Sequence, residues 1–344
     1  MLLSESVLPN DFSANTSYSA AYLADILMQS AVTYTPSNKV WKALPNDITS
    51  GNEQLVLVGQ GLNFASLQKI VQQYFSQTEQ CVFRLHPLHG KFAQQAVVMT
   101  LVHQEHENLV TTELLHSISA AFFIDCFSIS SVNIHEAGVL VMDMDSTIIN
   151  MECIDEIADL VGVGEKVSAL TERAMQGELD FNQSLNARVA CLTGISVDQL
   201  EALKSRLPIN PGFAETIAIL QHHGWTTVIA SGGFTYFANY LKDTFTLTDA
   251  FSNTLGIKDN LLTGKVEGDI VNGEMKRDIL LNTCEKYGIS TAQSVAIGDG
   301  ANDLVMMSAA QLGVAYKAKP KVKLAADASI QYCGFEGLLY CLVH

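Results

Sequence analysis

The chain has 344 residues, 48% of them hydrophobic, and its formal net charge is −16. This length predicts two domains, and the apolar content excludes a disordered chain. An acidic surface repels a phosphate backbone, so nucleic acid is excluded as a partner unless a basic patch exists. The densest basic cluster lies on either side of Pro320 without interleaved aromatic residues, and comprises Lys317, Lys319, Lys321 and Lys323. We therefore expect no nucleic-acid partner.

The cysteine content and the N-terminal segment indicate the cellular compartment of the protein. The seven cysteines are an odd number without CxxC spacing, which argues against a disulfide framework and against a structural zinc site. The segment MLLSESVLPNDFS has neither a basic region nor a continuous apolar region. No apolar stretch approaches the roughly 20 residues of a membrane span. We predict a cytoplasmic protein with neither a signal peptide nor a membrane helix.

The first third of the chain predicts an extension and a small α+β domain. Residues 1–48 are polar apart from an amphipathic helix predicted near Tyr22 to Met28. Over 49–130 the pattern changes to strand, helix, two strands around Gly90, helix and strand. This β-α-β-β-α-β order is typical of a ferredoxin-like module.

Two glycines in this module imitate the start of a dinucleotide-binding fingerprint. Gly59 and Gly61 have the spacing of its first two glycines, but Phe64 occupies the position of the third. We favour an ordinary strand-to-helix turn over a cofactor site.

After a predicted linker at 130–137, residues 138–344 predict an α/β domain. Continuous Val, Ile and Ala runs indicate strands buried on both faces, and hence a Rossmann-like parallel sheet. These runs are 138–143, 225–231, 294–299, 312–316 and 328–332. A helical insertion is predicted at about 153–207, because capping-box patterns begin at Asp180 and Ser196. A hairpin is expected around Asp259–Asn260.

The sequence VMDMDST places two carboxylates, Asp143 and Asp145, at the end of a hydrophobic strand. Ligands bind at the carboxyl ends of strands in an open parallel sheet. A calcium loop is the alternative, but Thr147 and Ile148 stand where its third carboxylate and its glycine belong. A solvated acidic turn is also disfavoured, because the preceding GVLVM is typical of a core strand. We favour chemistry at these two aspartates.

Three further motifs follow in the same domain. IGDGAND supplies Asp299 and Asp303 after another buried strand, and carboxylates there favour metal binding over phosphate binding. ASGGF offers the Ser231 hydroxyl, with backbone N–H groups at Gly232 and its neighbour for an anion. Lys276 is the best-placed cation between these motifs. Taken alone, a serine-glycine turn and a surface lysine are common features.

The order D-x-D-S-T, S-G-G, Lys and G-D-G-x-N-D resembles that of the haloacid dehalogenase superfamily of phosphotransferases. Within it the chain is similar to the phosphoserine phosphatase family, in the longer bacterial form with an N-terminal domain. MECIDEIA and ERAMQGELDFNQSLNARV look like the substrate-recognition cap of that family. The resemblance covers about 138–344. It implies Mg²⁺-dependent hydrolysis of phosphoserine, the last step of serine biosynthesis.

The resemblance also implies roles for individual residues. Asp143 is the expected nucleophile, and a carboxylate with a pKa of about 4 needs no activating base. Asp145 is the expected general acid and base. The expected magnesium ligands are the Asp143 carboxylate, the Asp145 carbonyl and Asp299, with Asp303 supporting them. Ser231, Gly232 and Lys276 are expected to hold phosphate oxygens.

Substrate selection is expected to come from the cap. Phe181, Leu185 and Arg188 are spaced to share one helical face, which otherwise suits a core face with an exposed arginine. The resemblance implies that Arg188 pairs with the substrate carboxylate and Glu152 with its ammonium group. Met175 and Phe181 would close an apolar lid. Asn302 is expected to orient the lysine or the substrate.

Two rival functions remain open at this point. The same site could pass the phosphoryl group to another small alcohol, or the chain could be a non-catalytic amino-acid sensor. The four intact motifs speak against a sensor. The front module at 53–129 is similar to ACT-like regulatory domains, so we expect it to mediate a homodimer. Serine sensing and a simple stabilising role are its two alternative further functions.

Overall fold

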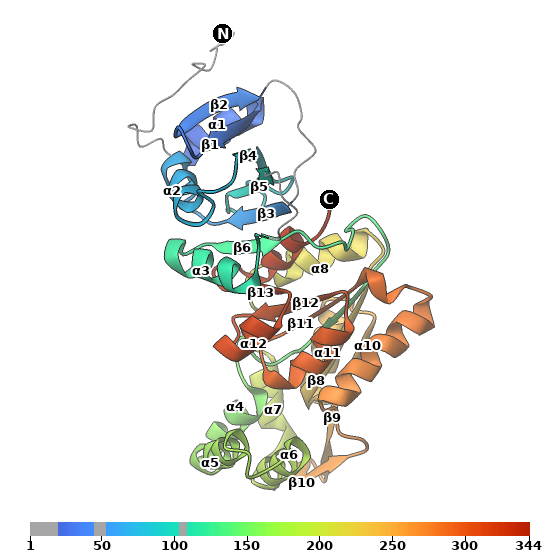
Figure 1. The fold of residues 1–344 in the computed structure, drawn as a ribbon. Coiled ribbons are helices and arrows are strands. Elements are labelled where there is room, and N and C mark those ends of the chain that lie inside the picture. Colours follow the sequence, from blue (N-terminus) through green and yellow to red (C-terminus); the bar gives the residue numbers. More distant parts are fainter. Residues whose placement is uncertain (1–19, 45–52, 103–108) are drawn as a thin grey trace. The chain divides into compact units, whose positions relative to one another are not determined.

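The computed structural model describes residues 20–44, 53–102 and 109–344. The chain divides into two compact units (Figure 1). The first comprises residues 1–130 together with 328–344, and the second comprises residues 131–327. Residues 328–344 are predicted to belong to the α/β domain at 138–344, so the observed division differs from the expected one at the C-terminus.

The first unit contains the ferredoxin-like module. Its elements are β3 (Glu53–Val58), α2 (Phe64–Tyr74), β4 (Gln80–Leu85), β5 (Ala96–Val102), α3 (Thr112–Phe122) and β6 (Asp125–Ser128). The strands are antiparallel in the order β4-β5-β3-β6. This order and the two crossover helices confirm the predicted α+β class.

The part of the extension that the structure describes holds more than the expected helix. Helix α1 (Ala20–Gln29) is followed by the hairpin of β1 (Ala31–Thr35) and β2 (Val40–Leu44). Strand β1 pairs with β4, so the hairpin extends the sheet of the module. Trp41 is buried and packs with the rings of Tyr34, Phe64 and Phe83. Residues 1–19 and 45–48 of the predicted extension lie outside the described residues.

A glycine contact explains why the module carries a glycine next to its first helix. A Cβ atom at Gly59 would lie 2.5 Å from Cγ2 of Ile124. Asn63 then begins α2 with a capping box, in which its side chain accepts the Ser66 N–H at 2.9 Å. The local structure is therefore the strand-to-helix turn that we favoured.

The C-terminal residues complete the first unit. They form β13 (Ala328–Ile330) and the 3₁₀ segment η3 (Phe335–Cys341), which contacts β3 and β6. The Asp125 carboxylate is fully buried and accepts backbone N–H groups of Gln331, Tyr332 and Cys333 at 2.7–3.3 Å. These bonds attach the end of the chain to β6.

The second unit is built on the parallel strands that the apolar runs predict. They are β7 (Val139–Met142), β8 (Thr226–Phe234), β11 (Ser294–Gly298) and β12 (Leu312–Tyr316), and every residue of β7, β11 and β12 is buried. Strand β7 pairs with β8 on one side and with β11 on the other. The helices are α8 (Phe213–His222), α9 (Thr235–Thr244), α10 (Gly273–Tyr287), α11 (Leu304–Ala309) and α12 (Pro320–Ala325). Side chains of α10, α11 and α12 share one core with alternate residues of the strands.

A helical cap and a hairpin complete this unit. The cap contains α4 (Cys153–Leu160), α5 (Gly164–Met175), α6 (Phe181–Ala190) and α7 (Val197–Lys204). The hairpin joins β9 (Asp249–Lys258) to β10 (Leu261–Glu267) through Asp259 and Asn260, both of which have positive φ as a tight turn requires. Both features agree with their predicted positions.

Candidate active site

Three aspartates meet at the carboxyl ends of β7 and β11. Asp143 directly follows β7, and Asp299 directly follows β11. Asp303 lies in the 3₁₀ turn η2 (Ala301–Asp303), where its carboxylate accepts the Gly300 N–H at 3.0 Å. One oxygen atom from each aspartate lies within 4.8 Å of the other two. Neighbouring parallel strands end at the same edge of the sheet, which is why these motifs meet.

Lys276 lies between two of these carboxylates. Its Nζ is 2.8 Å from Asp143 Oδ2 and 2.7 Å from Asp303 Oδ1, and its side chain is completely buried. Burial alone lowers the pKa of Lys276, but the two carboxylates outweigh it and raise the pKa above its ordinary value. The lysine therefore stays charged and holds Asp143 in place.

Lys276 neutralises only part of the negative charge that the three aspartates can carry. Burial, together with the charges of Asp143 and Asp303, raises the pKa of Asp299 to about 8. Burial and the Asp143 charge likewise raise the pKa of Asp303 to about 7. A bound cation would relieve this repulsion. The oxygen donor set of Asp143, Asp299 and Asp303 fits the preference of Mg²⁺ for carboxylate ligands.

Asp299 is positioned by two residues to which we assigned no role from the sequence. The Thr147 hydroxyl donates to Asp299 Oδ1 at 3.2 Å, and Asn210 Nδ2 donates to the Thr147 carbonyl at 2.8 Å. Thr147 and Asn210 are buried. Asn210 lies 63 residues beyond Thr147, outside any motif, so the sequence held no signal for it.

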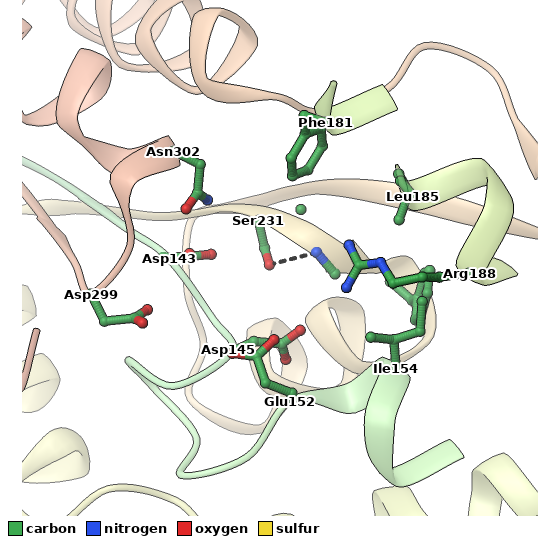
Figure 2. A pocket seen from close by; sticks show the side chains of 13 residues that line it. Asp143, Asp145, Glu152, Ile154, Phe181, Leu185, Arg188, Ser231, Asp299 and Asn302 are labelled. Carbon is green, nitrogen blue, oxygen red and sulfur yellow. Dashed lines mark hydrogen bonds between the residues drawn. The ribbon is translucent and has the colours of Figure 1, made fainter. Parts of the chain in front are cut away.

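The ASGGF segment forms the end of β8. Ser231 is buried, and its Oγ accepts the Gly233 N–H at 3.0 Å (Figure 2). A Cβ atom at Gly232 would lie 2.9 Å from Phe181 Cζ, and one at Gly233 would lie 2.8 Å from Asp145 Oδ2. A side chain at either glycine would have to displace the Phe181 ring or the Asp145 carboxylate. Asn253, a further residue that we did not predict, holds the segment by donating to the Gly232 carbonyl at 2.8 Å.

Asp145 and Glu152 form a second acidic group, in which the two side chains lie next to each other in the pocket (Figure 2). Asp145 Oδ1 is buried without a hydrogen-bond partner among the described residues. Burial, reinforced by the Glu152 charge, raises the pKa of Asp145 well above its usual range. Glu152 accepts the Ser146 hydroxyl at 2.7 Å, and burial raises its pKa as well. A carboxyl group with a raised pKa is suited to donating a proton.

The cap contributes a further wall of the pocket. Phe181, Leu185 and Arg188 of α6 all line it, together with Ile154 of α4 (Figure 2). Arg188 Nε is buried without a hydrogen-bond partner among the described residues. Burial lowers the pKa of Arg188, while Asp155, Glu152 and Asp145 act in the opposite direction. An arginine in this position can receive a carboxylate group from a ligand.

The resulting cavity has a volume of about 200 Å³. It brings together most of the predicted site residues, namely Asp143, Asp145, Glu152, Phe181, Arg188, Ser231, Gly232, Asp299 and Asn302. Lys276 and Asp303 lie behind Asp143 and do not line the cavity. Met175 does not line it either, because it stands at the end of α5 with 70% of its surface exposed. The structure therefore does not place Met175 in an apolar lid.

Comparison with known proteins identifies the family. A family model for haloacid dehalogenase-like hydrolases matches residues 138–311. The phosphoserine phosphatase of Haemophilus influenzae (strain ATCC 51907 / DSM 11121 / KW20 / Rd) is 54% identical over 213 residues, which cover 62% of this chain and 68% of the relative.

Solved structures agree with this assignment. A probable phosphoserine phosphatase from Vibrio cholerae, in its unliganded form, has a TM-score of 0.72 at 36% identity and covers 92% of this chain and 95% of that one. A phospho-aspartyl intermediate analogue of phosphoserine phosphatase has a TM-score of 0.57 at 38% identity, over 60% of this chain and 100% of that one.

None of the helices that the structure describes combines the length and the apolar character of a membrane span.

One conclusion follows from the acidic cluster at the carboxyl ends of β7 and β11, the buried lysine and the match over residues 138–311. The chain is a phosphatase and belongs to the haloacid dehalogenase-like hydrolase family.

Proposed function

We propose that this phosphatase hydrolyses O-phospho-L-serine to L-serine and phosphate, the last step of serine biosynthesis. The observation that carries the proposal is the composition of one pocket. Asp143 lies on one side of it, while Arg188 and Glu152 offer partners for a carboxylate and an ammonium group (Figure 2). The similarity to phosphoserine phosphatases supports the same substrate.

The first chemical step would take place at Asp143. Its carboxylate attacks phosphorus, the bond from phosphorus to the serine oxygen breaks, and an aspartyl phosphate forms. The protonated Asp145 carboxyl supplies a proton to the departing serine oxygen. Its raised pKa, caused first by burial, keeps a proton available for this transfer.

The second step would regenerate the enzyme. Asp145, now ionised, accepts a proton from a water molecule, and the oxygen of that water attacks the phosphorus atom of the aspartyl phosphate. The bond from phosphorus to the Asp143 carboxylate breaks, so phosphate leaves and Asp143 is free again. Asp145 thus acts first as an acid and then as a base.

Electrostatics decides whether the attack can occur. A phosphate dianion about 4 Å from one carboxylate costs about 8 kcal/mol at an effective dielectric of about 20. Mg²⁺ held by Asp143, the Asp145 carbonyl and Asp299, with Asp303 in support, would neutralise charge on the phosphoryl oxygens. Lys276 anchors Asp143, while the Ser231 hydroxyl at the pocket is available to a phosphate oxygen.

Two substrate analogues test the assignment of Arg188 and Glu152. O-phosphoethanolamine lacks the carboxylate, and 3-phosphoglycerate carries a hydroxyl in place of the ammonium group. We expect kcat/KM for each to fall by about tenfold or more relative to phosphoserine, since a charge-assisted hydrogen bond contributes about 1.5–3 kcal/mol. Equal phosphate release from all three compounds would contradict the proposed substrate.

The acceptor is tested in the same assay. Adding small alcohols separates transfer to water from transfer to an alcohol, because only water gives one free phosphate for every serine released. A shortfall of phosphate relative to serine would show that the chain is a phosphotransferase.

A further inference from the structure

We infer that the β9–β10 hairpin positions helix α6, and that Gly264 is the positioning residue through which the hairpin does so. The inference rests on the proposed function, because α6 carries Arg188, which we assign to the substrate carboxylate. Among the described residues that line the pocket, none belongs to the hairpin at 249–267. The hairpin holds Gly232 of the pocket through Asn253, and its second connection to the pocket is through the cap.

Backbone hydrogen bonds attach the cap to the hairpin. The Gly194 N–H donates to the Leu262 carbonyl at 2.8 Å, and the Leu262 N–H donates to the Ile195 carbonyl at 2.8 Å. The Val197 N–H donates to the Asn260 carbonyl at 3.0 Å. The connection between α6 and α7 thus behaves as a short additional strand on β10. It is fixed by bonds that do not depend on side chains.

Gly264 sets how closely the last turn of α6 approaches β10. Its φ is +75°, and a Cβ atom there would lie 2.0 Å from Thr193 Oγ1 and 3.3 Å from the Ala190 carbonyl oxygen. The Thr193 hydroxyl donates to that same carbonyl at 2.8 Å, so it cannot turn away without losing the bond. Ala190 is the last residue of α6. A side chain at 264 would therefore push the end of this helix.

Arg188 lies on the turn that would move. Its carbonyl accepts the Cys191 N–H at 3.1 Å, within the same C-terminal turn. Its Nε is buried and has no hydrogen-bond partner among the described residues. The position of the guanidinium group in the pocket consequently depends on where the helix places it. A small displacement of a binding group can weaken its contacts severely.

The test compares two glycines of the same region. Gly264→Ala adds the contact with Thr193, whereas Gly268→Ala is a matched control with a φ of +78° and no atom within 4 Å. Both variants acquire a methyl group in the left-handed region, so their backbone strain is similar. We expect Gly264→Ala to raise KM for phosphoserine by about tenfold, the effect of weakening one charge-assisted bond. Its kcat, and its hydrolysis of a generic aryl phosphate, should stay near those of Gly268→Ala.

Further variants separate positioning from general damage. Adding Thr193→Ala to Gly264→Ala removes the closest contact together with the bond to Ala190, so KM should fall to that of Thr193→Ala alone. If Gly264→Ala does not fold, Thr193→Val loses the bond to Ala190 and should raise KM several-fold. Thr171→Val is its control, because Thr171 makes the same kind of bond to Val167 on α5, outside the pocket.

An unchanged KM in the Gly264 and Thr193 variants, or equal losses on both substrates, would overturn the inference. Failure of the unaltered protein to hydrolyse phosphoserine would instead overturn the proposed function. The two failures are therefore distinguishable in one assay.

Discussion

At the scale of single residues, the site depends on charges that are buried beside one another. Asp143 is held by the fully buried Lys276, which also pairs with Asp303. Taking such ions out of water costs several kcal/mol per ion unless partners compensate them. The arrangement therefore contributes more to chemistry than to stability.

Replacing Asp143 by Asn retains the shape of the side chain but removes the charged nucleophile. We expect kcat for phosphoserine to fall by several orders of magnitude while the protein stays folded. Asp249→Asn is the control, since Asp249 does not line the pocket and its carboxylate contacts only the Ala250 N–H, at 2.9 Å, and the exposed Lys286, at 3.8 Å, among the described residues. Phosphate release measured for both variants checks this, and substantial activity in Asp143→Asn would exclude covalent catalysis at this residue.

Replacing Arg188 by Ala is expected to affect one class of substrate. The loss of a charge-assisted pair of about 1.5–3 kcal/mol should raise KM for phosphoserine by about tenfold to a hundredfold. A generic aryl phosphate has no carboxylate and should be hydrolysed almost as before. Arg173→Ala is the control, because Arg173 is another arginine of the cap, is half exposed and pairs with Glu178. Steady-state kinetics on both substrates check this prediction. Parallel losses of activity on the two substrates would mean that Arg188 has a purely structural role.

At the scale of elements, the ends of β7 and β11 bring the carboxylates together. This crowding predicts an absolute requirement for a divalent cation. Removal by a chelator should abolish phosphate release, and Mg²⁺ should restore it. Calcium should restore it poorly, because its larger and looser coordination shell suits a different ligand geometry. Full activity in excess chelator would contradict the metal assignment.

A second prediction at this scale concerns β6 and the C-terminal residues. Asp125→Ala leaves the N–H groups of Gln331, Tyr332 and Cys333 without their acceptor, and the bond to Cys333 is buried. An unsatisfied buried donor costs about 1–3 kcal/mol, so we expect the free energy of unfolding to drop by about 1–3 kcal/mol. Denaturant titration measures this, with exposed Asp243→Ala as the control. If both variants were equally stable, these bonds would not hold the C-terminal segment.

At the scale of the whole molecule, the first unit carries the proposed self-association. The β1–β2 hairpin already covers the β4 edge of its sheet, so pairing between two copies on that side must use β2 instead. An exposed edge strand is a template for such pairing. We predict that the full chain sediments as a dimer. A chain of residues 131–344 should sediment as a monomer, and a monomeric full chain would contradict this role.

The same shortened chain tests where catalysis resides. Every residue that we assign to the chemistry lies beyond 131, so each folded molecule should keep its activity. Deleting 1–130 also removes β3 and β6, against which η3 packs. We therefore expect poorer solubility. Inactivity in chains that circular dichroism shows to be folded would mean that the first unit takes part in catalysis.

The sequence by itself determined the class of the fold and most of the pocket. Apolar runs marked the buried parallel strands, and motifs at their carboxyl ends marked Asp143 and Asp299, because both signals are local.

Only the tertiary structure decided what depends on distant contacts. It placed 328–344 in the first unit through Asp125, left Met175 exposed, and revealed Thr147, Asn210 and Asn253 as positioning residues. Hydrogen bonds between residues far apart in the chain impose no periodicity on the sequence, so no local pattern indicates Asn210 or Asn253.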